Sequence, residues 1–552
     1  MSRFLTQPRR ALGLGLLVAL IGAAAVALAV GGCAGHSTRP AAQTPTRTRP
    51  LETIFEAQTE LFQSPGPTLD TLKRLGVDRV KVFMPWSYLA PDPLSHTRPH
   101  FDAASPEGYP AGNWGIFDAI IREAAAHGIG LDVALEAPAP LWATGPNVPR
   151  GTASSFLGAW EPSPKQFGMF VHAVATRYSG HYTPPGGGPP LPKLDFWSIW
   201  NEPNYGQQLA PQAVSGSSVE LSPALYRRLL DAAWSALQST GHQHDTVLIG
   251  EIAPRGQTVG NQPGNFSGMV PLRFIRALYC VDSSLRPLSG AAATARSCPS
   301  TSAGSEAFVR EHPALFQASG FAFHPYPQGF APNVRTPDEP DYADLPQLGP
   351  LERTLDGAMA AYGSHVQLPL YDTEFGYQTS PPDTQAGTVS PGVAAEWLNW
   401  AEYLHWRNPR IASYDQYLMR DPVPPPGGGP YTAFATGLQT YTGQDKPTLA
   451  SFTMPLYLPA TKTASGHPLE VWGCVRPATT AARTSHRPQF VQIQYRSGPA
   501  GPCKTVDRVR LPKAYCYFDV RTTFPGSGSV RLSWSYPHGP VINSRIVAVT
   551  VG

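Results

Sequence analysis

The sequence predicts an α/β fold, a (β/α)8 TIM barrel that is preceded by an amino-terminal targeting segment and followed by a small all-β sandwich domain. The first observation is that strand-like runs alternate with helical patterns over residues 53–455, which is typical of parallel strands joined by helices. The second is that these runs number eight, as a closed barrel requires. They lie at 54–59, 79–84, 130–135, 194–200, 246–250, 320–324, 368–373 and 411–417.

Helical patterns separate the predicted strands. Residues 117–124 place apolar side chains at positions i, i+3, i+4 and i+7, and a glycine follows as a stop signal. Ser222-Pro223 and Ser390-Pro391 each combine an N-cap residue with a proline at the first helical position, so we expect helices to begin there. These helices would cover the outside of the barrel.

The periodicity changes after the barrel, and residues 456–552 are predicted to form the β-sandwich. Between 530 and 536, apolar residues alternate with polar ones, which indicates a half-buried strand. Segments 490–495, 515–520 and 545–551 have the same pattern. Such an accessory domain could be structural or could bind carbohydrate, and the pattern does not distinguish these roles.

Residues 1–33 are interpreted as a signal peptide or membrane anchor. Arg9 and Arg10 precede an apolar run that ends at Cys33, and the residues before this cysteine resemble a lipobox. Lipidation of Cys33 is one outcome, and an uncleaved membrane anchor is the other. Residues 34–52, rich in Thr, Pro and Arg, would be a flexible linker. Each version predicts an extracellular protein that is anchored at the cell surface or secreted.

The remaining cysteines agree with export, because disulfides persist outside the cytoplasm. Cys280 and Cys298 enclose a Ser/Ala-rich loop and are predicted to form a disulfide. Cys474 and Cys503 are predicted to form a second one, which leaves Cys516 as a buried, inert thiol on a strand. None of these cysteines has the spacing of a metal site, so no metal or other cofactor is expected.

The charge balance narrows the class of partners. The chain has 42 basic and 39 acidic residues, a net charge of +3, with no basic patch or acidic run. Nucleic acid is therefore not an expected partner. We expect a monomer.

The most informative motif is Trp-Asn-Glu-Pro-Asn at residues 200–204, directly after the fourth predicted strand. It places the amide of Asn201 and the carboxylate of Glu202 at the carboxyl end of a strand, where (β/α)8 barrels build their active sites. A second carboxylate, Glu374, follows the seventh strand in the segment 370–374. Two glutamates on strands four and seven can face each other across the barrel mouth.

With these two motifs, residues 53–455 resemble clan A glycoside hydrolases, in particular cellulase-like family 5 enzymes and family 39 enzymes. The resemblance implies a retaining enzyme that cleaves O-glycosidic bonds of an extracellular poly- or oligosaccharide by double displacement. Glu202 would be the acid/base and Glu374 the nucleophile. Asn201 would hydrogen-bond the sugar 2-hydroxyl.

Two other acidic residues compete with Glu374 for the second catalytic role. Asp372 lies two residues before it, and Glu251 follows the fifth strand, where it could serve the site or a salt bridge. At the end of the sixth strand, His324 and Tyr326 resemble the His-x-Tyr of clan A enzymes. There the tyrosine contacts the nucleophile and the histidine helps to bind sugar. A buried structural histidine is the alternative.

The chain departs from the family pattern at two strands. Lys81 stands where the family usually carries an arginine beside the nucleophile, so either Lys81 substitutes for it or Arg79 takes the role. The third strand ends at Glu136 instead of the family's frequent histidine. The remaining candidates for sugar contact are Trp86, Trp142 and Tyr417. For the two tryptophans, packing in the core is the alternative role.

Insertions are expected at 205–221, 281–306 and 327–350, and two of them follow strands four and six on the catalytic face.

Three other functions stay open. The barrel could be catalytically inactive and bind carbohydrate at the cell surface, or it could be a structural envelope protein. A transglycosylase with the same site is the third alternative.

Overall fold

The computed structural model describes residues 42–43, 50–213, 217–257, 265–336, 339–425, 433–499 and 501–552. The predicted targeting segment and its candidate lipidation site, Cys33, lie outside these residues, as does most of the predicted linker. Within the described part of the chain, no helix combines the length and the apolar character that crossing a bilayer requires.

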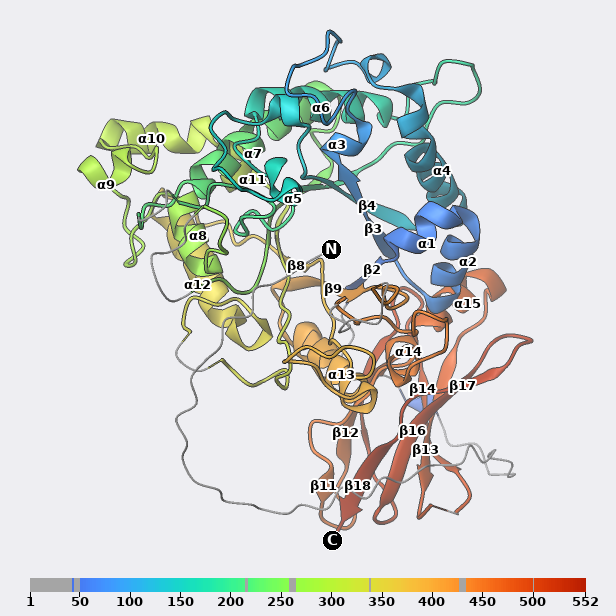
Figure 1. The fold of residues 1–552 in the computed structure, drawn as a ribbon. Coiled ribbons are helices and arrows are strands. Elements are labelled where there is room, and N and C mark those ends of the chain that lie inside the picture. Colours follow the sequence, from blue (N-terminus) through green and yellow to red (C-terminus); the bar gives the residue numbers. More distant parts are fainter. Residues whose placement is uncertain are drawn as a thin grey trace.

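Eight parallel strands form a closed barrel, and each neighbours the next in chain order (Figure 1). The last strand pairs with the first, so the sheet has no edge. All eight predicted strands are confirmed; the first ends earlier than predicted because a helix, α1 (Gln58–Gln63), begins there. The strands are β2 (Glu52–Glu56), β3 (Arg79–Pro85), β4 (Gly130–Glu136), β5 (Phe196–Ile199), β6 (Thr246–Ile252), β7 (Gly320–Phe323), β8 (Leu370–Asp372) and β9 (Ile411–Tyr417).

Helices surround the barrel, as Figure 1 shows. The longer ones are α2 (Pro65–Leu75), α4 (Ala111–His127), α6 (Pro164–Arg177), α7 (Ser222–Ser239), α8 (Pro271–Leu278), α10 (Ser302–Glu311), α12 (Leu348–Ala360) and α13 (Pro391–Arg407). The shorter ones are α3 (Trp86–Leu89), α5 (Ser154–Leu157), α9 (Gly290–Thr294), α11 (Pro313–Gln317) and α14 (Pro447–Thr453).

The predicted helix starts are correct to within one residue. Ser390 is the N-cap of α13, and its hydroxyl accepts a hydrogen bond from the Val393 amide at 3.3 Å. Ser222 is instead the first residue of α7, and its hydroxyl donates to the Gln212 side chain at 2.9 Å. The expected N-cap at Ser222 is therefore wrong, because this hydroxyl bonds the preceding loop instead of a helix amide.

Alternation along each strand decides which side chains face the barrel axis. On β4, Leu131, Val133 and Leu135 belong to the large apolar core shared with the helices. Asp132 and Glu136, on the other face, therefore point into the barrel. The same reasoning places Lys81 of β3 inside, since both of its neighbours pack outward. Polar side chains thus fill the interior towards the carboxyl ends of the strands.

The chain after the barrel, drawn in orange and red in Figure 1, forms two β-sheets around one apolar core, and a two-residue strand from the predicted linker before the barrel joins the larger sheet. The four predicted strands are confirmed to within two residues. The larger sheet contains β1 (Ala42–Gln43), β14 (Lys504–Arg510), β13 (Phe490–Arg496), β16 (Gly528–Ser535), β18 (Val547–Val551), β11 (Lys462–Thr463) and β17 (Val541–Asn543). The smaller sheet contains β10 (Leu456–Tyr457), β12 (Leu469–Cys474) and β15 (Tyr517–Thr522).

The β-domain is joined to the barrel by α15 (Arg476–Ser485), which packs against α2 (Figure 1). The guanidinium of Arg476 is fully buried and forms an ion pair with Glu402 of α13. It also donates to Thr53 at 3.4 Å, at the amino-terminal end of β2. Gly76, which ends α2 with φ of 81°, meets the Arg476 carbonyl so closely that a Cβ would lie 2.3 Å from its oxygen. The contact therefore requires glycine.

One predicted disulfide is confirmed and one is wrong. Cys280 and Cys298 are bonded, with their Cα atoms 5.6 Å apart. Cys474 is bonded to Cys516 and not to Cys503, which is itself disulfide-bonded. The pairing of β12 with β15 places Cys474 opposite Tyr517, next to Cys516. The sequence alone does not give this register, so the prediction that Cys516 is a free thiol is wrong.

Candidate active site

Glu202 and Glu374 converge at the carboxyl ends of their strands. Glu202 follows β5 through a turn in which Trp200 and Glu202 have φ of 70° and 41°, a left-handed conformation that is unusual for such residues. The Glu202 amide donates to the Glu251 carbonyl at 2.8 Å, which fixes this turn to β6. One oxygen of each glutamate and a nitrogen of His324 all lie within 4.8 Å of one another. The structure therefore brings together the two predicted catalytic carboxylates.

His324 lies between the carboxylates and has no exposed surface. Its Nδ1 is 3.1 Å from Glu202 Oε1 and 3.6 Å from Glu374 Oε2, and its Nε2 is 2.9 Å from Glu251 Oε2. Burial alone would lower the pKa of His324, but Glu374 and the other carboxylates raise it to about 10. At neutral pH the ring is therefore an imidazolium that donates from both nitrogens. A metal ion held by Glu202, His324 and Glu374 would have to displace one of these protons.

Lys81 lies beside Glu374, in the position predicted from the family pattern. Its ammonium is 2.8 Å from Glu251 Oε2 and 3.3 Å from Glu374 Oε1. Burial would lower the pKa of Lys81, but the neighbouring glutamates raise it well above its ordinary value, so the amine stays charged. Arg79, the alternative, lies lower in the barrel and pairs with Glu52 at 2.9 Å. Lys81, and not Arg79, therefore provides a positive charge beside Glu374.

Glu251 holds the two cations together. Its Oε2 accepts from Lys81, from His324 and from the Thr373 hydroxyl, the last at 2.9 Å. Burial would raise the pKa of Glu251, but Lys81 and His324 hold it well below its usual range. The side chain has no exposed surface. Of the two roles left open by the sequence, the structure therefore places Glu251 in a buried salt bridge.

A β-bulge turns Glu251 into the barrel. Leu248 faces the axis and Ile249 faces the helices, so regular alternation would direct Glu251 outwards. The register between β6 and β7 shifts after Ile249, and Gly250 adopts φ of 102°. A Cβ on Gly250 would lie 2.6 Å from the Ala322 carbonyl oxygen, so this bulge requires glycine. The bulge explains why the sequence pattern could not place Glu251.

Asp372, the other competitor, lies outside this cluster. It is fully buried, and its Oδ2 is 3.0 Å from His405 Nε2 of α13 and accepts from the Asp415 amide at 3.4 Å. Burial raises the pKa of Asp372, and His405 opposes that rise. Since it faces the helix layer, Asp372 is not available to a molecule between Glu202 and Glu374.

Aromatic side chains surround Glu374. The Tyr326 hydroxyl donates to Glu374 Oε2 at 3.2 Å, as the His-x-Tyr pattern predicts. Tyr417 meets the Tyr326 ring edge-on, with ring centroids 6.2 Å apart. Phe434 contacts both rings, at 5.1 Å from Tyr326 and 5.7 Å from Tyr417. No sequence pattern singled out Phe434, because it lies in the loop after β9.

The two candidate tryptophan platforms lie in the core. Trp86 has no exposed surface and stacks on Phe170 of α6 at 5.9 Å. Trp142 packs edge-on against Trp86 and donates its Nε1–H to the Pro91 carbonyl at 2.9 Å. The prediction that these indoles stack on a sugar is therefore not supported, since their faces are covered by other side chains.

Several acceptors in the cluster have no donor. The side-chain oxygen of Asn201 is buried and accepts no hydrogen bond from the described residues. Glu56, the last residue of β2, has a buried carboxylate oxygen that is likewise without a donor there. Burial raises the pKa of Glu56 well above its usual value, and burial raises the pKa of Asp132 to about 7. These carboxyl groups are therefore readily protonated, which limits the negative charge below the site.

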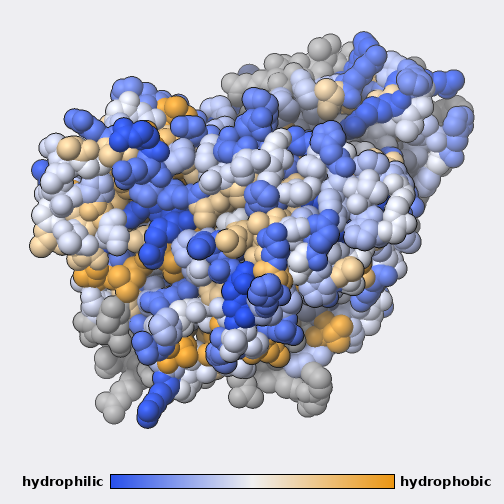
Figure 2. All heavy atoms as spheres, turned by 90° about the horizontal axis from the view of Figure 1, so that it is seen from above, coloured by the Kyte–Doolittle hydropathy of each residue, from blue (hydrophilic) through white to orange (hydrophobic). Residues whose placement is uncertain are grey.

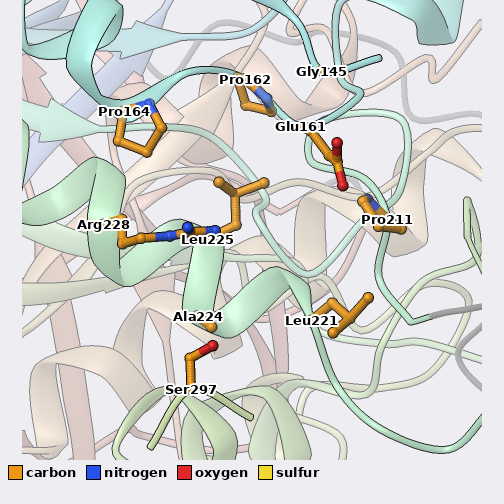
Figure 3. Close-up of a pocket in the computed structure, with 10 residues that line it drawn as sticks. All are labelled: Gly145, Glu161, Pro162, Pro164, Pro211, Leu221, Ala224, Leu225, Arg228 and Ser297. Atoms are coloured by element: carbon orange, nitrogen blue, oxygen red, sulfur yellow. The ribbon is translucent and has the colours of Figure 1, made fainter. Parts of the chain in front are cut away.

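A cavity of about 340 Å³ lies away from this cluster, between the beginnings of α6 and α7 (Figure 3). Pro162 and Pro164 line one side, and Leu225 and Arg228 of α7 line another. Glu202 and Glu374 do not line it. Over the face shown in Figure 2, apolar side chains occur in small groups scattered among polar ones.

The sequence matches no protein-family model, and no curated protein is similar to it. Among solved structures, the chain is similar to a family 39 glycoside hydrolase from Bacteroides cellulosilyticus WH2, with 13% identity, a TM-score of 0.43, and coverage of 86% of this chain and 79% of that one. It is also similar to a glucosidase from Croceicoccus marinus, with 12% identity, a TM-score of 0.44, and coverage of 91% and 98%. An endo-β-1,4-mannanase from Thermotoga petrophila has 12% identity, a TM-score of 0.39, and coverage of 92% and 100%.

These neighbours are a family 39 glycoside hydrolase, a glucosidase and a mannanase, and the likeness is distant. The functional argument therefore depends on the side chains of the site.

Proposed function

We propose that the protein is a retaining glycoside hydrolase that cleaves O-glycosidic bonds of an extracellular poly- or oligosaccharide. The observation that carries the proposal is the approach of Glu202 and Glu374, whose nearest oxygens lie within 4.8 Å of each other. Carboxyl groups roughly 5–5.5 Å apart favour retention, whereas inversion needs roughly 6.5–9.5 Å to admit a water molecule. The observed approach supports the first geometry.

Glu202 acts as the general acid and then as the general base. Burial raises the pKa of Glu202, and Glu374 adds to the rise, while His324 and Lys81 oppose it. A raised pKa keeps a proton on Glu202 for donation to the glycosidic oxygen as the bond to the leaving group breaks. In the second step the ionised Glu202 takes a proton from water, which attacks the anomeric carbon.

Glu374 acts as the nucleophile. Its two oxygens are contacted by the Lys81 ammonium at 3.3 Å and by the Tyr326 hydroxyl at 3.2 Å. Both groups donate to the carboxylate oxygens. The carboxylate attacks the anomeric carbon to form a glycosyl ester, and the attack of water then breaks this ester and frees the sugar.

The proposal also covers sugar contacts, oligomeric state and location. Asn201 carries a buried, unpaired amide oxygen next to Glu202 and would contact the sugar. Tyr417 and Tyr326 would provide the aromatic surface beside it. We also propose that the protein is monomeric and acts outside the cytoplasm, anchored by its amino-terminal segment or secreted. The disulfides Cys280–Cys298 and Cys474–Cys516 support the location.

The experiment combines turnover with covalent labelling. Purified protein would be assayed on a panel of 4-nitrophenyl glycosides and polysaccharides, and incubated with 2-deoxy-2-fluoro glycosides of the same configurations. Mass spectrometry should find the label on Glu374. Glu202→Gln should lower kcat by about 10²- to 10⁴-fold, and Glu374→Gln should abolish labelling. Glu306→Gln, an exposed residue of α10, is the matched control.

Other outcomes would identify the alternatives. Sugar binding without turnover, unchanged by Glu374→Gln, would mean an inactive carbohydrate-binding barrel. Labelled Glu374 with products that gain sugar units would mean a transglycosylase. Full activity in either glutamine variant would contradict the assigned roles.

A further inference from the structure

Glu136 occupies the rim of the barrel at a position the catalytic steps do not use. It is the last residue of β4, and it lies on the same face of this strand as Asp132, which points into the barrel. Its Cα is paired with that of Pro85, the last residue of β3, at the carboxyl end of the sheet. Glu136 therefore faces the level at which Glu202 and Glu374 meet.

The electrostatic environment of Glu136 places it with the catalytic pair. Burial raises the pKa of Glu136 well above its usual value. The Lys81 charge opposes this rise, whereas the carboxylates of Glu374, Glu251 and Glu202 add to it. All four charges belong to the cluster described above, so Glu136 shares their surroundings.

The carboxylate of Glu136 keeps contact with solvent at the rim and has no hydrogen-bond partner among the described residues. Only 9% of the residue is exposed, and no hydrogen bond or ion pair to its side chain comes from the described residues. Glu251, at the same level, accepts three hydrogen bonds. A carboxylate that reaches solvent and has no donor from the protein can accept hydrogen bonds from a bound molecule in place of water. Glu136 can therefore accept a hydrogen bond from a ligand that carries a hydroxyl or ammonium group.

Asn201 provides a second acceptor of the same kind. It is 7% exposed, and its buried side-chain oxygen has no donor among the residues the structure covers. It lies next to Glu202 in sequence, whereas Glu136 comes from the neighbouring strand. Two unpaired acceptors from adjacent strands are suited to a molecule with several hydroxyl groups.

We propose that Glu136 is a substrate-binding residue that accepts hydrogen bonds from hydroxyl or ammonium groups of the sugar between Glu202 and Glu374, and that it makes the site reject uronic acids. This inference rests on the proposed glycosidase function and names its substrate class, neutral or amino sugars. A sugar carboxylate would face the ionised form of Glu136 with a like charge and without a donor, whereas the protonated form could donate to it. The preference is therefore measured at alkaline pH and should weaken as the pH falls.

The positions of the cations support this selectivity. Lys81 contacts Glu251 and Glu374, and His324 contacts Glu202 and Glu251. Both positive charges in the cluster are therefore committed to protein carboxylates. A uronate would have to compete with these carboxylates for a counter-ion, and sites that leave a buried charge unpaired discriminate strongly between substrates.

The test uses pairs of 4-nitrophenyl glycosides that differ only at carbon 6, glucoside with glucuronide and galactoside with galacturonide. The wild type should cleave the neutral member at least about 100-fold better in kcat/KM. Glu136→Gln should lower kcat/KM for the neutral substrate by about tenfold, mainly through KM, and should reduce the preference over the uronide at least about tenfold. Glu306→Gln should match the wild type.

Binding of 1-deoxynojirimycin, measured by calorimetry, keeps the test independent of turnover, and thermal denaturation checks the fold of each variant. The affinity for 1-deoxynojirimycin should fall by at least about tenfold in Glu136→Gln. An unchanged substrate preference and an unchanged affinity in a folded variant would overturn the inference and leave the glycosidase proposal intact. If the wild type neither cleaves any neutral glycoside nor takes a fluorosugar label, the proposed function itself fails, and this inference with it.

Discussion

Replacing Glu251 with glutamine should destabilise the protein strongly, although the two side chains have the same shape. The substitution leaves an amide oxygen that can still accept from the Thr373 hydroxyl. It removes the negative charge that lies 2.8 Å from Lys81 and 2.9 Å from His324. Both cations are fully buried, so water cannot replace the lost charge.

The size of the effect follows from these two contacts. A hydrogen bond to a charged group contributes about 1.5–3 kcal/mol, so two of them amount to about 3–6 kcal/mol. Removing one partner from a buried ion pair typically costs about 3–5 kcal/mol. We therefore expect Glu251→Gln to lower the free energy of unfolding by about 4 kcal/mol, whereas Glu306→Gln should change it by less than about 0.5 kcal/mol.

Urea denaturation near pH 7, followed by circular dichroism, would measure this difference. A double-variant cycle with Lys81→Met tests its cause, because removing the amine also removes the uncompensated charge. The double variant should be less destabilised than the sum of the single variants by at least about 1 kcal/mol. Strict additivity, or a loss below about 1 kcal/mol in Glu251→Gln, would refute the view that Glu251 neutralises both cations.

Three further predictions concern other parts of the protein. Tyr326→Phe removes the hydroxyl that contacts Glu374 and should lower kcat/KM by about 10- to 100-fold without loss of secondary structure, which steady-state kinetics and circular dichroism would check. The pKa of Asp132 in the native state is raised to about 7, so the native state keeps this proton to a higher pH than the unfolded state. The free energy of unfolding should therefore fall as the pH rises from about 4 to about 7, by at most about 1.4 kcal/mol per pH unit. Asp132→Asn should therefore gain stability relative to the wild type between these pH values in urea titrations, and parallel pH profiles would contradict this. Replacing Cys280 and Cys298 together with alanine should lower the free energy of unfolding by about 2–4 kcal/mol in the same assay, and an unchanged urea midpoint would argue against a stabilising cross-link.

Local periodicity was sufficient to predict the barrel. Each of its strands is short and bounded by breakers, and the helical stripe at 117–124 lies within α4 as expected. The convergence of Glu202 and Glu374 could also be predicted, because it depends only on where their strands end. These features require no knowledge of how distant segments pair.

Features that depend on register or packing were not predictable. The bulge at Gly250 reverses the direction of Glu251, and the alignment of β12 with β15 selects Cys516 as the partner of Cys474. Trp86 follows a strand exactly as a platform residue would, but α6 covers it. In each case the deciding neighbour lies far away in the sequence.

The ion pair between Arg476 and Glu402 has a consequence for how the molecule unfolds. Its two charges come from the β-domain and from the barrel, and Tyr517 of the β-domain also donates to Glu402 at 2.7 Å. If the β-domain detached, a buried carboxylate and the apolar surface around it would be opened to water. The two regions should therefore melt in a single transition, and a chain cut after residue 455 should not yield a stable barrel. The barrel and the β-domain, which the sequence pattern distinguishes as two domains, should therefore unfold as one cooperative unit.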